Sequence, residues 1–112
     1  MTRAALLACL LLLAPRVHAL SAEASEFMAI TRELAPVQCE KRKLRREIAL
    51  AEAERRDTKE LRARFRRIDR DPKTARLEKR LAQLEPRLAK SSDPEDLAAI
   101  SRQQREAFYR CE

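Results

Sequence analysis

The apolar residues of this chain recur at intervals of three and four, the spacing that places side chains on one face of an α-helix. The pattern divides at Asp71-Pro72 and Asp93-Pro94, where an aspartate suited to an N-cap precedes a proline suited to a first helical turn. We therefore predict helices at about 37–70, 72–90 and 94–111. The apolar stripe of the last helix is expected to contain Leu97, Ile100, Gln104, Phe108 and Cys111.

Pro36 interrupts the pattern, because proline lacks an N–H and disfavours helix at the residue before it. A kink or a break is expected there, which makes residues 20–36 a short N-terminal helix or arm. Its Phe27, Ile30 and Leu34 favour docking on the rest of the protein, and a mobile arm is the alternative. The stripe of the next helix is also weak where Arg55 and Thr58 occupy apolar positions.

The first 19 residues have the three-part layout of a secretory signal peptide. Arg3 is followed by eleven apolar residues, 4–14, and then by a small residue, Ala19, before the expected cleavage site. Eleven residues span only about 16 Å as a helix, which is too short for a bilayer. Cleavage would remove the only His and two Arg residues, lowering the formal charge from +7 to +5. We expect export to the periplasm or the extracellular space.

Two cysteines, Cys39 and Cys111, remain after that cleavage. An oxidising compartment favours a disulfide between them. The predicted helix lengths agree, since a chain that descends on one helix and returns on two would bring these residues together. Free thiols, or pairing of Cys111 with another chain, are the alternatives.

The composition supports the same fold class. The chain has no Gly, Trp or Asn, 38% of its residues are charged, and 4% are aromatic. Such a mixture suits long helices better than sheets. We predict an all-α protein, with residues 37–112 forming an antiparallel helical hairpin or small coiled-coil-like bundle closed by a Cys39–Cys111 disulfide.

Little catalytic chemistry is available to the mature chain. It has no His for general base catalysis, and its two cysteines do not have the spacing of a zinc site. Carboxylates such as Glu52 and Glu60 lie four residues from Arg56 and Arg64, the spacing of ordinary helix ion pairs. We therefore expect no enzyme, no catalytic residue, no metal and no cofactor.

Positive charge is concentrated in one part of the chain. Residues 20–40 have a net charge of −3, residues 41–80 of +9, and residues 81–112 of −1. A basic stripe of this kind indicates an anionic partner. The candidate residues are Lys41, Arg42, Lys43, Arg45, Arg46, Arg62, Arg66, Arg67 and Arg70. A solvated helix surface is the alternative, because 8 acids interleave with the 17 bases of residues 41–80.

These observations favour an exported, non-enzymatic structural or interaction module of the cell envelope. Its partner would be a protein or an anionic envelope component such as lipid headgroups or an acidic polymer. Nucleic acid is disfavoured by the export signal and by the scarcity of aromatic residues among the basic ones. The apolar seam from Leu77 to Leu88 also permits a homodimer.

The stretch from Ile100 to Phe108, Ile-Ser-Arg-Gln-Gln-Arg-Glu-Ala-Phe, resembles the Leu-Thr-x-x-Gln-x-x-x-Phe motif of the Spy/CpxP class of periplasmic helical chaperones. The resemblance covers nine residues. It implies an ATP-independent chaperone or envelope-stress protein that holds unfolded clients on a basic, amphipathic surface. This is the alternative function.

Overall fold

The computed structural model describes residues 20–90 and 93–111. They form four α-helices and no strand: α1 (Ala22–Ala53), α2 (Lys59–Asp69), α3 (Pro72–Lys90) and α4 (Pro94–Arg110). The predicted all-α class is confirmed. The expected signal peptide lies outside the described residues.

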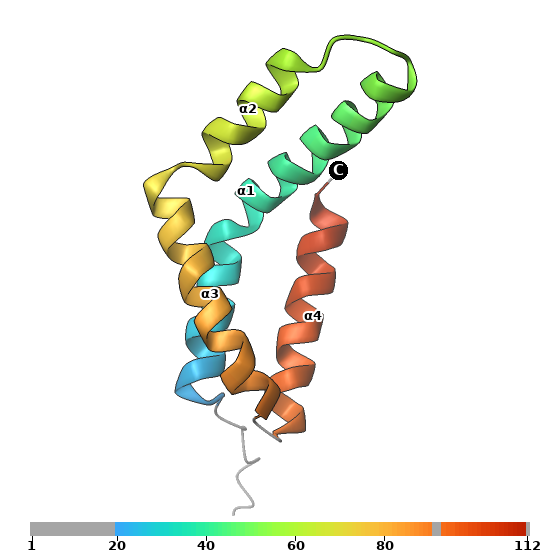
Figure 1. The fold of residues 1–112 in the computed structure, drawn as a ribbon. Coiled ribbons are helices and arrows are strands. Elements are labelled where there is room, and N and C mark those ends of the chain that lie inside the picture. The colour runs from blue at the N-terminus through green and yellow to red at the C-terminus, as the bar shows by residue number, and fades with distance from the viewer. Residues whose placement is uncertain (1–19, 91–92, 112) are drawn as a thin grey trace, which may run out of the picture.

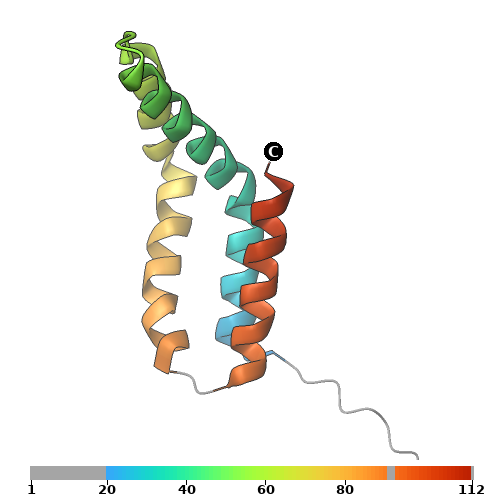
Figure 2. The same cartoon turned by 90° about the vertical axis from the view of Figure 1, so that its right-hand side faces the viewer.

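α1 is the central helix, and each of the other three packs against it (Figures 1 and 2). Ion pairs show that α3 runs antiparallel to the first half of α1, since Glu23 meets Arg87 and Glu33 meets Lys73. α2 returns antiparallel along the second half of α1. α4 is parallel to the first half, and its last turn reaches the middle of α1.

The molecule therefore has two parts along α1. Residues 20–40, 72–90 and 93–111 form a three-helix body, and residues 41–70 form a two-helix distal hairpin. The main apolar core lies in the body, where buried side chains of α1, α3 and α4 meet. It comprises Ala24, Phe27, Ile30, Leu34, Leu84, Leu88 and Ile100. In the hairpin only Leu44 and Ala51 are buried apolar residues, so this part is thinner.

Of the two outcomes expected at Pro36, the helix has the kink and not the break. α1 continues through this proline and bends in its middle, so residues 22–36 are the first half of the central helix and not an arm (Figure 2). Proline removes one helical hydrogen bond and crowds the preceding turn, which kinks a helix without having to end it. Phe27, Ile30 and Leu34 keep the helix in place because all three are buried in the core.

The predicted single helix at 37–70 is also wrong, because the chain turns between Ala53 and Lys59. This is where Arg55 and Thr58 weaken the apolar stripe. A continuous helix would have no apolar face to bury there, and the reversal instead lets α2 pack on α1. As a result α3 extends past Cys39 to the start of α1, and α4 comes back beside it. The prediction that α3 and α4 follow each other end to end along one long helix is therefore wrong, since both lie beside the first half of α1.

Cys39 and Cys111 form the predicted disulfide, with their Cα atoms 5.5 Å apart. It joins the middle of α1 to the end of α4, so it is not at the open end of a hairpin as the predicted topology implied. The bond spans a sequence separation of 72 residues. A loop of that length corresponds to about 4 kcal/mol of stabilisation in the chain-entropy treatment.

The reversal after α1 uses a left-handed residue that is not glycine. Arg55 has φ of 55°, its N–H donates to the carbonyl of Glu52, and the N–H of Arg56 donates to the carbonyl of Ala51. This pair of hydrogen bonds is the Schellman ending of a helix, where glycine is usual. A side chain in this conformation costs roughly 1–2 kcal/mol.

We predict that Arg55→Gly stabilises the protein by about 0.5–1 kcal/mol, because relief of the left-handed strain exceeds the added entropy of the unfolded chain. Urea unfolding followed by circular dichroism measures the change. Arg56→Gly is the matched control, since among the described non-glycine residues only Arg55 has a positive φ, and this change should destabilise. Equal effects of the two substitutions would contradict the assignment of strain to Arg55.

Candidate functional site

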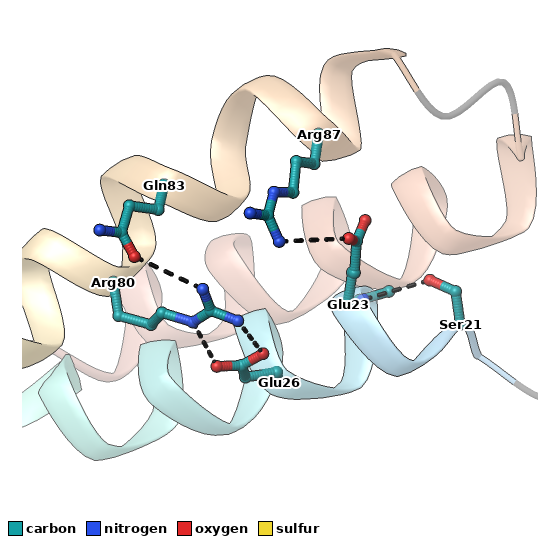
Figure 3. Close-up of polar contacts among 7 residues, drawn as sticks. Ser21, Glu23, Glu26, Arg80, Gln83 and Arg87 are labelled. Atoms are coloured by element: carbon teal, nitrogen blue, oxygen red, sulfur yellow. Dashed lines mark hydrogen bonds and ion pairs between the residues drawn. The ribbon is translucent and has the colours of Figure 1, made fainter.

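Ion pairs between α1 and α3 neutralise the acidic part of the chain. Glu26 accepts two hydrogen bonds from Arg80, at 2.6 and 2.8 Å, and Arg80 also donates to Gln83 (Figure 3). The hydrogen bonds from Arg80 hold the pKa of Glu26 below its usual value. Lys73 lies 2.7 Å from Glu33, and Arg87 lies 3.6 Å from Glu23 in the same interface.

This pairing leaves the excess of positive charge in the distal hairpin. Residues 41–70 contain 13 basic and 6 acidic residues, and ten of the basic ones are arginine. Arginine presents a planar fork of donors that matches carboxylate and phosphate groups. The hairpin is therefore the candidate functional site, and its nine predicted basic residues are found in three different environments.

Lys41 is not part of the basic surface, because the residue is only 4% exposed. It lies where α1, α2 and α3 meet, and its Nζ is 2.7 Å from Asp69 and 2.9 Å from Glu78. Gln38 also donates to Glu78. The sequence pattern placed Lys41 in a run of basic residues, but three-helix packing gives it a structural role.

The electrostatics of this cluster favour the charged forms of Lys41 and Asp69. Burial disfavours the charge of Lys41, but hydrogen bonds to Asp69 and Glu78 outweigh burial and raise its pKa above 10.5. The hydrogen bond from Lys41 is the main cause of the lowered pKa of Asp69. Together these contacts fix the junction between the distal hairpin and the three-helix body.

A second group of basic residues lines a groove between α1 and α2. The groove has a volume of about 370 Å³, and Arg45, Arg62 and Arg66 lie along it beside Phe65. The guanidinium of Arg45 is 5.2 Å from the centre of the Phe65 ring. Arg62 pairs with Glu52, which also lines the groove. Arg66 is exposed and forms no ion pair with the described acidic residues.

Arg66 also links this groove to a second depression on α2, where Arg67 and Arg70 lie. Arg67 makes only a long ion pair, 3.7 Å from Glu60, and both side chains are largely exposed. The groove and the depression thus present Arg45, Arg62, Arg66, Arg67 and Arg70 to solvent along one side of the hairpin. We name this set the groove arginines.

The remaining predicted residues are Arg42, Lys43 and Arg46. They lie on α1 and do not line the groove. Arg42 lies over the ring of Phe108 in α4, 4.4 Å from its centre. Lys43 is half-buried and Arg46 is exposed. Arg46 is about 100° around α1 from Arg45, so it does not face the α2 groove.

The contact between Arg42 and Phe108 was missed in the sequence, although the disulfide contained the signal for it. Arg42 is three residues after Cys39, and Phe108 is three residues before Cys111, so the bond places them within one turn of each other. Phe108 was expected on the apolar packed face of α4. Phe108 is instead 56% exposed, and Leu97, predicted on the same face, is 42% exposed. The face of α4 that packs against the rest of the body contains Asp96, Ile100 and Gln103.

The stretch that resembles the chaperone motif divides between these two faces. Ile100 is buried in the core, whereas Gln104 and Phe108 are exposed. Residues 20–90 and 93–111 contain no group of three or more His, Cys, Asp or Glu side chains placed to hold a metal ion. Over the same ranges no helix combines the length and apolar character needed to cross a membrane.

No protein-family model, curated protein or solved structure matches the chain. The distal hairpin is therefore identified as a candidate site by its geometry and charge alone.

We predict that the double substitution Asp69→Asn with Glu78→Gln destabilises the protein by about 2 kcal/mol. It leaves the buried Lys41 charge without a counter-charge, and the cost falls below the 3–5 kcal/mol typical of fully buried pairs because water reaches the two acids. Urea unfolding at neutral pH measures the loss. Glu60→Gln, which removes an exposed ion pair, is the control and should leave the midpoint unchanged.

The same variant should alter the pH dependence of stability. Asp69 has a lowered folded-state pKa, so its contribution is complete above the ordinary carboxyl pKa of about 4 and is lost as the pH falls through the folded value. Lys41 has a raised pKa, so its contribution is complete below 10.5 and is lost at higher pH. Wild-type stability should therefore fall more steeply between pH 5 and about 2 than that of the variant. Parallel profiles would show that this cluster does not couple to protonation.

Proposed function

We propose that the protein is exported to the cell envelope and acts there without catalysis, as a helical interaction module whose distal hairpin binds an anionic partner. The observation that carries this proposal is the convergence of Arg45, Arg62 and Arg66 on one groove. The sequence from 1 to 19 supports export, and the Cys39–Cys111 disulfide suits an oxidising compartment.

The division of the molecule also supports this function. The three-helix body contains the larger core and pairs its own acids with bases of α3. The distal hairpin buries little and keeps exposed arginines that its six acids cannot neutralise. A positive surface on a rigid support attracts anions at long range and holds them with charge-assisted hydrogen bonds.

We predict that the double substitution Arg66→Glu with Arg67→Glu lowers affinity for an anionic polymer at least tenfold, because it reverses two groove arginines. Binding to immobilised heparin in increasing salt is the measurement, and the wild-type affinity should fall steeply with salt. The control is Lys90→Glu with Arg102→Glu, which makes the same charge change on the three-helix body. These residues are exposed and form no ion pair with the described acids.

The control should retain most of the wild-type binding. Equal losses in the two variants would show that net charge, and not the groove, determines binding. Salt-independent retention, or no retention at low salt, would contradict the proposed function as a whole.

A further inference from the structure

One face of α1 packs against α4. Because α4 ends beside Cys39 while α1 runs on to Ala53, the same face of α1 extends beyond the end of α4. In the three-helix body this face includes Met28, whose carbonyl accepts a hydrogen bond from Gln103, and Cys39, which is bonded to Cys111. Thr31, Arg32 and Ala35 line the same contact. Steps of three and four residues along a helix stay on one face, and from Cys39 they lead to Arg42, Arg46 and Leu50.

This continuation is not covered by any other described helix. α4 ends beside the middle of α1, and α2 packs on a different side of the hairpin (Figures 1 and 2). Arg46 is exposed, and Leu50 is 54% exposed although it is a large apolar residue. The end of α4 adds Phe108, which Arg42 contacts, and Tyr109, whose ring meets that of Phe108 edge to face and which is 71% exposed. We name Arg42, Arg46, Leu50, Phe108 and Tyr109 the aromatic-basic face.

The composition of this face combines positive charge with exposed apolar groups. Residues 42–50 contain four basic residues and one acid, Glu47. Of the four large apolar side chains that are most exposed in the described residues, three belong to this face: Leu50, Phe108 and Tyr109. The guanidinium of Arg42 lies over the Phe108 ring, so the basic residues of α1 and the aromatic pair of α4 are in contact at this point.

We infer that the aromatic-basic face docks on an anionic lipid surface, as a second binding surface beyond the groove arginines of the proposed function. Arginine forks match lipid phosphates, and tyrosine is suited to the boundary between headgroups and acyl chains because it has an apolar ring and a polar tip. Basic residues near an anionic membrane gain attraction from its surface potential, and apolar side chains gain by leaving water.

Lipid fits this face better than a soluble polyanion does. A soluble acidic polymer would pair with the arginines but leave Leu50 and Tyr109 in water. Single-stranded nucleic acid stacks its bases on open aromatic faces, whereas one face of Phe108 is occupied by Arg42 and its ring meets Tyr109 edge to face, with centroids 5.8 Å apart.

The test is flotation of the disulfide-bonded protein with vesicles of pure phosphatidylcholine and with vesicles that contain 30% phosphatidylglycerol. The wild-type protein should bind only the anionic vesicles. Leu50→Ser with Tyr109→Ser should weaken this binding about tenfold, because it removes two exposed apolar groups and no charge. Leu97→Ser, an exposed apolar residue three turns from Phe108 on α4, is the matched control and should bind as the wild type does.

Heparin binding by the same variants separates the two proposals. Retained heparin binding together with lost vesicle binding in the Leu50/Tyr109 variant supports the lipid surface. Heparin binding without vesicle binding, vesicle binding that is insensitive to Leu50 and Tyr109, or tighter binding of a single-stranded oligonucleotide would each overturn the lipid inference and leave the proposed function standing. Binding of neither heparin nor vesicles would overturn both.

Sedimentation of the lipid-free protein measures whether it self-associates. A dimer that dissociates in the Leu50/Tyr109 variant would assign this face to a second copy of the chain, and so would overturn the lipid inference. Circular dichroism verifies that each variant is folded, and substitutions at positions this exposed should not unfold the helices.

Discussion

The bond between Cys39 and Cys111 determines where one part of the molecule ends and the other begins. It holds the last turn of α4 against the middle of α1. Up to that point α1 is packed by α3 and α4. Beyond the contacts of Lys41 with Glu78 and of Arg42 with Phe108, which lie just past the disulfide, α1 packs against α2. The core therefore lies on one side of the disulfide, and the thinner hairpin with its exposed arginines lies on the other.

The charge of the chain divides at the same place. Bases of α3 contact acids in the first half of α1, so opposite charges that are far apart in the sequence become neighbours. At the junction, Lys41 brings together Asp69 of α2 and Glu78 of α3. The net positive charge of the described residues is thus not spread over the surface, because the arginines of residues 41–70 outnumber the acids within reach. The three-helix body is thus largely neutralised by its own ion pairs, and the distal hairpin keeps an excess of positive charge.

Local signals were sufficient for part of this architecture. Asp71-Pro72 and Asp93-Pro94 specify helix starts through capping chemistry, and α3 and α4 begin at those prolines. The cysteine pair was also evident, because two cysteines in a chain that the sequence predicts to be exported favour one bond. Whether Pro36 would kink or end the helix was left open by the sequence. Its local cost is outweighed by the burial of Phe27, Ile30 and Leu34, which depends on helices more than 40 residues away.

The candidate site was harder to predict for the same reason. A run of basic residues does not show which of them will be buried, and Lys41 is buried by contacts with residues 28 and 37 positions later in the chain. Nor does the periodicity of α4 alone distinguish its packed face from its exposed one. Ile100 packs inward whereas Phe108, on the predicted same stripe, faces solvent beside Arg42.

If the distal hairpin binds an anionic partner while the three-helix body supports it, a ligand should protect the hairpin alone. Amide hydrogen exchange with and without a short heparin oligosaccharide tests this most directly. The hairpin buries few apolar residues, so its local opening should be frequent, and a ligand that binds its closed form should slow exchange there. We predict slower exchange in residues 41–70 and unchanged exchange in residues 22–36 and 94–110. Slowing confined to the three-helix body, or no slowing in the hairpin at saturating ligand, would contradict this account.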